Sequence, residues 1–587
     1  MDWKRLGQRR GTRRWFLGVS GATLGAAGLA ATGCGGSPAK PTPSPSPTSA
    51  TAPPVRTPIT GPRPTPTRDP NDRHGGFVRY TGFIRSINGQ FDPHKTSAPP
   101  LHAQQAMVFS RLLTYEDQAA GVIGPDLAVG LPEQPDPQTY VFHLNAAARW
   151  HDIAPLSGRA VTADDVKFSI ERQAAGDLSF ARRAQWSMVE SVEATDPETV
   201  VVGTSAPYAE LLDLVAGVGS FVLAPEVAGP GMVMSPQTQI GSGPFLWVEW
   251  NEGDFASVSA NHAWHGGNQR PFLDGVTVIH RTDTATIEGD LRTRALDAAI
   301  VGRPQADRLK QSIPELVEAT AGLALFFSMR FVTSEPPFND PRLRTAISIA
   351  LDRRAMVEHF FAGSGFINPW VSAPITRWAL PEAELFTYAG YRPGTGGRET
   401  DIQEARGLLE AYLSENTIDD GLRLLVTSDA EEVLGMGSLM SRQLQENLGL
   451  AVTVTPVPIG ELIQRLLEGE APWAAGPDTG WLGLDDWTYQ YFHSAGTNNS
   501  FPLRDPDMDA LIEQQRAEMN PDARRELGYA IQRRLLELNV AANFVSEKIV
   551  TLRWPYVQNF PLDAADGYQH RFADCWIDHT DPTYTGS

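Results

Sequence analysis

The sequence predicts an α/β fold from two observations: helical and strand patterns alternate along the chain, and cap residues mark helix starts between the strands. The clearest unit covers residues 422–457. Its first part, 422–427, is an apolar run typical of a strand, and its last part, 452–457, alternates between apolar and polar residues. Between them, leucines recur at helical spacing up to Gly449. This order predicts a βαβ crossover.

The helix of this unit contains a partial glycine motif. Gly435 and Gly437 match the first two glycines of a dinucleotide-binding fingerprint, but Met440 occupies the place of the third. The third glycine allows helix and strand to pack closely, so its absence argues against nucleotide binding.

Capping residues predict four further helices. Thr162, with Asp165 three residues later, forms a capping-box pattern. Asp340 followed by Pro341 predicts a second helix start, and Asp352 a third, in a helix that ends near Gly363. Asp401 with Glu404 predicts the fourth, whose apolar face would hold Ile402, Ala405, Leu408, Leu409 and Leu413.

The first 33 residues have the features of an export signal. Arg13 and Arg14 precede Trp-Phe-Leu and an apolar run rich in glycine and alanine, which predicts recognition by the twin-arginine export machinery. The run ends on small residues before Cys34, and this predicts cleavage there and lipidation of the cysteine. The alternative is a membrane-spanning helix over 15–33, although its many small residues make it only weakly apolar.

Residues 34–74 are predicted to be a tether. Twelve of the 46 prolines lie within 38–70, interleaved with serine and threonine. This composition cannot bury a core and favours extended polyproline segments. Extended at about 3.1 Å per residue, the tether would hold a domain up to about 100 Å from the membrane.

Charge and cysteine content exclude several classes of function. The formal net charge is −20, and the leader carries six basic residues and one acidic residue, so its removal leaves −25. Binding of nucleic acid or anionic lipid by the body is therefore disfavoured. The two cysteines, Cys34 and Cys575, leave no intrachain disulfide once Cys34 is lipidated, and they provide no cysteine metal cluster.

Neither catalytic motifs nor a metal site are predicted. Nucleophile elbows, zinc-protease motifs and phosphate-binding loops are absent from the sequence. His262 and His265 have a spacing suited to a metal, but their Gly/Asn-rich surroundings favour a surface loop. His151 and Asp152 are predicted to be a structural hydrogen-bonded pair. We expect no cofactor.

The best candidate for a binding site is the aromatic stretch 480–500. Two readings stay open, because dense aromatics are often core residues, whereas flat amphipathic rings also line ligand clefts. We treat Asp485 and Asp486 as adjacent residues on a strand, which would point to opposite faces and could not flank one glycosidic bond. The candidate ligand contacts in this stretch are Trp481, Asp485, Asp486, Trp487, Tyr489, Asn498 and Asn499.

Nine motifs in register resemble one protein family, the peptide/nickel class (family 5) of extracellular solute-binding proteins of ABC importers. They include Gly75-Gly-Phe, Phe91-Asp-Pro, the segment from Tyr140 to Asp152, Gly241-Ser-Gly-Pro-Phe and Gly480-Trp481. The resemblance implies a periplasmic-binding-protein-like fold, in which two lobes joined by a two-segment hinge clamp a ligand and a smaller lobe lies outside. The implied boundaries are 75–110 with 236–325 and 546–587 for lobe I, 111–235 for accessory lobe II, and 326–545 for lobe III.

The resemblance also implies the function. The sequence departs from the family pattern at two positions. Peptide-binding members use an aspartate after the matching tryptophan to bind an ammonium group; here the third residue after Trp481 is Leu484, and Asp485 follows it. Arg330 stands where the family commonly has asparagine, so it is either an exposed strand-end residue or a ligand contact.

The expected partners are a small polar solute, ABC permease and ATPase subunits, and the membrane through the lipid anchor, with a monomer as the expected state. We expect no catalysis; a secreted hydrolase and a ligand sensor are the alternatives.

Overall fold

The computed structural model describes residues 72–587 with gaps at 83–89, 97–98, 176–178, 268, 282, 419–420, 429–430, 469, 479, 497–498, 500–501, 566 and 587. The export leader, Cys34, almost all of the tether and Asn498 therefore lie outside the described residues. Across the part that is described, no helix is both long enough and apolar enough to span a membrane.

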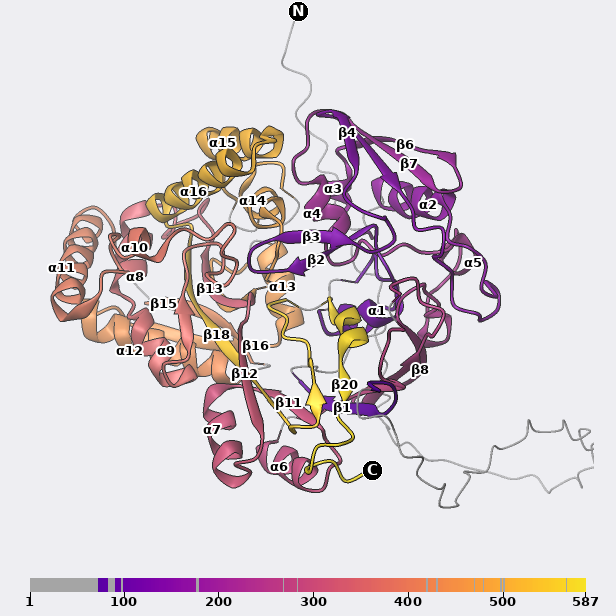
Figure 1. Cartoon of the computed structure of the whole chain (residues 1–587). Coiled ribbons are helices and arrows are strands. Elements are labelled where there is room, and N and C mark those ends of the chain that lie inside the picture. The colour runs from indigo at the N-terminus through magenta and orange to yellow at the C-terminus, as the bar shows by residue number, and fades with distance from the viewer. Residues whose placement is uncertain are drawn as a thin grey trace, which may run out of the picture. The chain divides into compact units, whose positions relative to one another are not determined.

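A twelve-stranded mixed sheet forms the centre of the fold (Figure 1). Its order is β16-β15-β17-β13-β18-β11-β1-β10-β9-β8, and β12 and β14 also pair with β18. The strands are β1 (Phe77–Thr81), β8 (Phe245–Asn251), β9 (Phe255–Ala260), β10 (Gly275–Ile279), β11 (Ala298–Val301), β12 (Val317–Gly322), β13 (Phe326–Phe331), β14 (Gly365–Ile367), β15 (Leu422–Thr427), β16 (Val452–Val457), β17 (Trp473–Asp478) and β18 (Ala541–Arg553).

Strand β18 connects the two halves of this sheet. Its N-terminal part pairs with β13, from Arg330 opposite Ala541 to Phe327 opposite Val545. Its C-terminal part lies between β11 and β12, with Val301 opposite Val550. The hinges expected near 325 and 545 fall at this change of partners, and the lobe boundaries stay a prediction.

The βαβ prediction is confirmed. β15 and β16 pair in parallel, Leu422 opposite Val452, and α12 (Glu431–Leu448) connects them. Leu439 and Leu444 on α12 are buried, as their helical spacing predicts, and Gly449 follows the helix with a φ of 69°, a conformation that glycine adopts without strain. The unit is therefore built by its local pattern.

The capping predictions are correct at three helices and wrong at the fourth. Thr162 and Asp165 form a capping box at α2 (Ala163–Ala174), Asp340 caps α8 (Pro341–Ala350), and Asp352 caps α9 (Arg353–Phe361). The fourth helix, α11, runs over Gly394–Leu413, so Asp401 lies in its interior, and its expected face residue Leu413 is exposed.

The start of the fourth helix was predicted wrongly because Asp401 and Glu404 belong to an ion-pair cluster. Arg392, just before α11, contacts both Asp401 and Glu404, at 2.7 and 3.0 Å. The pair that resembles a capping box thus binds a side chain instead of the helix's first backbone N–H groups.

The remaining elements surround the main sheet. A small antiparallel sheet has the order β4-β5-β7-β6, and two two-stranded sheets join β2 with β3 and β19 with β20. Their bounds are β2 (Leu113–Asp117), β3 (Val122–Pro125), β4 (Glu133–Asp136), β5 (Thr139–His143), β6 (Val189–Asp196), β7 (Thr199–Thr204), β19 (Val557–Gln558) and β20 (Trp576–Ile577). The other helices are α1 (Pro99–Val108), α3 (Arg183–Trp186), α4 (Leu211–Ala216), α5 (Pro225–Ala228), α6 (Thr284–Arg292), α7 (Arg303–Ser312), α10 (Glu382–Leu385), α13 (Ile459–Glu468), α14 (Leu484–Phe492), α15 (Pro506–Ala517) and α16 (Pro521–Leu538), with 3₁₀ turns at Pro236–Thr238 and Gln569–Asp574.

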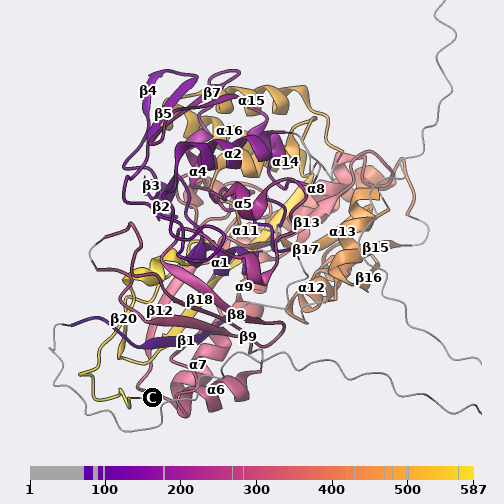
Figure 2. The ribbon, with the colours of Figure 1, turned by 90° about the vertical axis from the view of Figure 1, so that its right-hand side faces the viewer.

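Two large hydrophobic clusters stabilise the fold. One contains β13, β15, α8 and α12 residues such as Met329 and Leu424. The other extends from Val78 on β1 to Tyr208 beside α4 and Trp487 on α14. Figure 2 shows α14, α15 and α16 together at the top of the view; Asp486 on α14 pairs with Arg182, and Arg524 on α16 with Glu210, so the last part of the predicted third lobe packs on the predicted accessory lobe.

Candidate functional site

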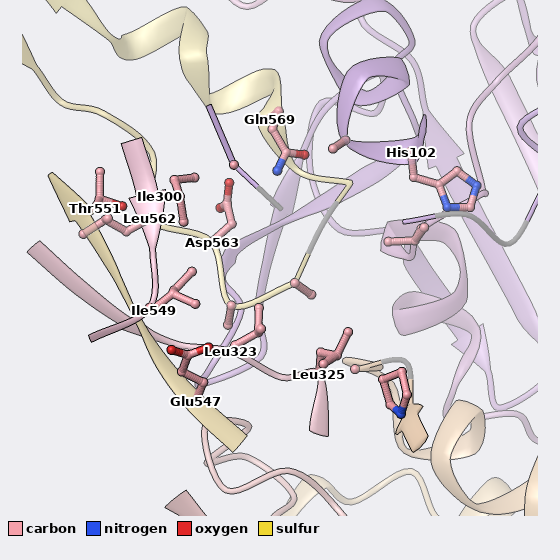
Figure 3. A pocket seen from close by; sticks show the side chains of 18 of the residues that line it. His102, Ile300, Leu323, Leu325, Glu547, Ile549, Thr551, Leu562, Asp563 and Gln569 are labelled. Carbon is pink, nitrogen blue, oxygen red and sulfur yellow. The ribbon is translucent and has the colours of Figure 1, made fainter. Parts of the chain in front are cut away.

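A cavity of about 680 Å³ lies where the two halves of the main sheet meet (Figure 3). Its lining comes from three parts of the chain. One wall is formed by β11, β18 and the loop 560–565, a second by Arg182 and Gly219, and the third by residues including Phe327 and Trp481. The volume suits a small solute, and the mostly apolar lining is typical of ligand cavities.

One face of β18 lines this cavity. Glu547, Ile549 and Thr551 alternate along the strand, so their side chains share a face, and all three line the cavity. Figure 3 shows them on one strand with Leu323 nearby. Most of this wall is apolar; Glu547 on β18 and Asp563 in the loop are carboxylates within it.

Two histidines in the lining have structural roles. His94 Nε2 lies 2.7 Å from the Phe221 carbonyl oxygen, and His102 Nε2 lies 3.2 Å from that of Pro93. Burial lowers the pKa of each histidine to about 4. Both rings are therefore neutral at pH 7 and offer no positive charge to a ligand.

Arg182 brings a positive charge to the cavity wall, but Asp486 balances it. Its guanidinium donates to the Asp486 carboxylate at 2.7 Å and to the Val218 carbonyl oxygen at 2.9 Å. Burial opposes its charge, yet Asp486 raises the pKa of Arg182 above its ordinary value. The ion pair with Asp486 holds the Arg182 side chain in place at the cavity wall.

The predicted aromatic stretch is a helix for most of its length. Residues 484–492 form α14, so the treatment of Asp485 and Asp486 as strand neighbours is wrong. Trp481, just before the helix, lines the cavity. Trp487 is fully buried, stacks on Phe326 with a centroid distance of 5.1 Å, and donates its indole N–H to the Trp481 carbonyl oxygen.

The structure places Asp485 outside the cavity lining. Its carboxylate accepts hydrogen bonds from Arg516 Nε at 3.1 Å, from the Tyr208 hydroxyl at 3.1 Å and from Gln515 at 3.0 Å. The side chain is completely buried. Asp486 is likewise buried, with Arg182, Gln185 and Gln490 as its donors. This packing favours a structural role for both carboxylates.

The other candidates also lie outside the lining. Tyr489 stacks on His493 at 4.5 Å and lies under the Arg516 guanidinium. Asn499 donates to two backbone carbonyl oxygens of its own loop, those of His493 and Leu503. Arg330 lies 5.9 Å from the centre of the Tyr491 ring. Ligand contact by any of these residues stays a prediction.

The structure shows the surroundings of the histidines that the sequence analysis considered as metal ligands. His265 contacts Asp126 at 3.2 Å, and His262 is exposed. His151 is buried and contacts the backbone at Gly241 and Gly243, so its structural role does not depend on Asp152, which is exposed. Within the described residues, no group of three or more histidine, cysteine or acidic side chains is placed to hold a metal ion.

Sequence reasoning missed Glu547. Burial raises the pKa of this carboxyl to about 7, although a hydrogen bond from the Arg303 backbone N–H acts in the opposite direction. Glu547 lies between Ser546 and Lys548 in the sequence, so no local pattern distinguished it from an exposed carboxylate. The face on which it lies became evident only from the pairing of β18 with its neighbours.

Comparison with known proteins gives one family and a consistent fold. The model of bacterial extracellular solute-binding proteins, family 5 Middle, matches residues 122–500. The glutathione-binding protein GsiB of Salmonella typhimurium is 26% identical over 396 residues, which cover 64% of this chain and 72% of that protein.

Two solved structures share the fold. The periplasmic binding protein DppA from Helicobacter pylori, in complex with the peptide STSA, has a TM-score of 0.71 at 18% identity and covers 86% of this chain and 99% of its own. The murein tripeptide binding protein MppA of Escherichia coli has a TM-score of 0.71 at 19% identity and covers 85% and 98%. The predicted α/β periplasmic-binding-protein fold is thereby confirmed.

Proposed function

Since this chain belongs to the family 5 bacterial extracellular solute-binding proteins, we propose that it captures a small polar solute and delivers it to the permease and ATPase subunits of an ABC transporter. The observation that carries this proposal is the cavity itself. It lies where β18 changes partners, and its walls come from the segments assigned to all three lobes. Rotation about this junction would open and close the cavity around a solute.

A peptide-like solute is favoured. The relatives include a glutathione-binding protein, a protein solved with a peptide and a murein tripeptide binding protein. The cavity volume suits a solute of a few residues, and the apolar lining with few charged groups would bury its side chains while fixing its polar ends. We infer no catalysis: the lining carboxylate Asp563 is bound by Arg571 and Gln118 rather than placed beside a nucleophile.

The expected location is the outer face of the cytoplasmic membrane or the periplasm. Arg13 and Arg14 support export, Cys34 supports a lipid anchor, and the tether to residue 74 would carry the body away from the bilayer. In this arrangement a monomer reaches the permease while remaining tied to its membrane.

The test is native mass spectrometry of the purified protein to identify a co-purifying solute, followed by small-angle scattering with and without it. We expect a 1:1 complex and a smaller radius of gyration on binding. A tight ligand that leaves the scattering unchanged would remove the closure mechanism. Turnover of peptide or glycoside substrates would favour a hydrolase, and a neighbouring receptor gene without a permease gene would favour a sensor.

A further inference from the structure

We propose that Glu547 is the anchor for a cationic group of the solute, an ammonium or a guanidinium. The proposal rests on the function proposed above and identifies the chemistry of the ligand. Glu547 lines the cavity from the strand that joins the two halves of the sheet, so a cation bound there would contact the protein at the junction where closure takes place.

The carboxylate lacks a cation of its own. Among the described residues, no lysine, arginine or histidine nitrogen lies within ion-pair distance of Glu547. Lys548 is the next residue along β18, so it points to the other face, where its ammonium lies over the Phe366 ring. The Arg303 guanidinium is bound to Asp307 and Glu318. Glu547 is half-buried, and withdrawing an unpaired carboxylate from water is costly, so the protein gains when a ligand supplies the counter-charge.

A purely structural role uses only part of the hydrogen-bonding capacity of the Glu547 carboxylate. The Arg303 backbone N–H at the start of α7 donates to it, so Glu547 helps to cap this helix. A carboxylate has about four acceptor positions, and this contact occupies one. Burial outweighs the cap, because the pKa lies at about 7 instead of below its ordinary value.

The charged surroundings also favour a cation. Glu432 on α12 lines the cavity with an exposed side chain, and its like charge acts to raise the pKa of Glu547. Arg308 on α7 also lines the cavity with an exposed side chain, so solvent screens the fields of both residues. Arg182 is neutralised by Asp486. No cation from the described part of the chain is therefore fixed beside Glu547, and Arg308 is available to an acidic end of the same solute.

The experiment compares matched cationic and neutral probes by calorimetry at pH 8. The cationic probes are trialanine amide, acetyl-lysine amide and acetyl-arginine amide. Their neutral counterparts are acetyl-trialanine amide, acetyl-norleucine amide and acetyl-citrulline amide. We expect at least one cationic probe to bind wild type at least about 30-fold more tightly than its counterpart, because the neutral probe leaves the carboxylate unpaired. Glu547→Gln should remove this difference.

Two variants separate anchoring from folding and from net charge. Glu547→Gln keeps an oxygen that can accept the Arg303 N–H, so its thermal unfolding temperature should not fall. Glu133→Gln removes the same charge from an exposed site, with 76% of the side chain accessible, and should leave binding of the cationic probes unchanged.

Several results would overturn the anchor. These are equal affinity for cationic and neutral probes, unchanged affinity in Glu547→Gln, or no binding of any cationic probe at millimolar concentration. If an uncharged co-purifying solute still closes wild type and Glu547→Gln equally in scattering, the anchor fails while the transport function stands. If no probe binds and no solute induces closure, both the anchor and the transport function are contradicted.

Discussion

The Glu210 carboxylate and the Arg524 guanidinium form a fully buried ion pair that joins the start of α4 to α16. Arg524 also contacts Asp213, which in turn accepts a hydrogen bond from the Tyr115 hydroxyl at 2.6 Å. Burial acts to raise the pKa of Glu210, and the Arg524 guanidinium acts to lower it. These contacts connect the predicted accessory lobe to the last helices of the predicted third lobe, so the two segments are expected to move as one body.

Removal of Arg524 should destabilise the protein strongly. Arg524→Ala leaves Glu210 and Asp213 buried without this cation, and breaking a buried pair in this way costs about 3–5 kcal/mol. Urea unfolding followed by tryptophan fluorescence would measure the loss. The neighbouring Arg525 pairs with Asp522 on the surface, so Arg525→Ala should cost less than about 1 kcal/mol. Equal effects of the two variants would contradict the assignment.

Local patterns were sufficient for much of the fold. The βαβ unit and the caps at Thr162, Asp340 and Asp352 depend on residues close in sequence, and the structure confirms them. The start assigned at Asp401 failed because the same spacing of acidic residues also serves an ion-pair cluster around Arg392. A local pattern does not show which partner a carboxylate has.

The site was harder to predict because its determinants are distant in sequence. Asp485 has the composition of a ligand contact, but its partner Tyr208 lies 277 residues away, and Asp486 binds Arg182 across 304 residues. Glu547 was missed for the converse reason. Its role depends on which face of β18 lines the cavity, and this is decided by pairing with β11, β12 and β14.

Substitution of Asp485 should affect stability more than affinity. Asp485→Asn removes the charge that balances the buried Arg516 and weakens the bond from Tyr208, so we expect a loss of about 3 kcal/mol in unfolding free energy. The affinity for the co-purified solute, measured by calorimetry on the folded fraction, should stay within about threefold, or under ~0.7 kcal/mol. A large loss of affinity with unchanged stability would instead restore Asp485 as a ligand contact.

The two tryptophans of the aromatic stretch should separate binding from folding. Trp481 lines the cavity, so Trp481→Ala should weaken many solutes through lost contact area while changing stability little. Trp487 is completely buried, and Trp487→Ala should cost about 3–5 kcal/mol of stability. Calorimetry and thermal unfolding on both variants give the comparison. A Trp481→Ala protein with wild-type affinity would place the solute elsewhere.

The proposed lipid anchor depends on the thiol of Cys34. Cys34→Ala should be exported without lipid and move from the membrane fraction to the soluble one, because the thiol that would carry the lipid is gone. Cell fractionation with immunoblotting, and mass measurement of the purified protein, provide the readout. Cys575 is buried in the body, so Cys575→Ala serves as the matched control and should stay membrane-bound. A Cys34→Ala protein that remains in the membrane uncleaved would indicate a spanning helix.

The unliganded protein should lose stability between about pH 4.5 and pH 7 through Glu547. The folded state keeps a proton on this carboxyl up to about pH 7, whereas the unfolded chain releases it near the ordinary value of 4.5. The folded state therefore binds more protons in this window, and its free energy of unfolding falls as pH rises. A shift of about 2.5 units corresponds to at most about 3 kcal/mol.

Glu547→Gln should remove this pH dependence, so the variant becomes more stable than wild type at pH 8 and not at pH 4. Glu432, whose like charge acts to raise the pKa of Glu547, would share the effect, and Glu432→Gln should reduce it in part. Arg308 lines the same cavity, but its exposed charge is screened, so Arg308→Gln should leave the pH dependence unchanged. Urea unfolding at a series of pH values tests all four proteins. Parallel stability curves for wild type and Glu547→Gln would show that the carboxyl is already ionised and paired in the free protein, which would contradict its vacancy for a solute cation.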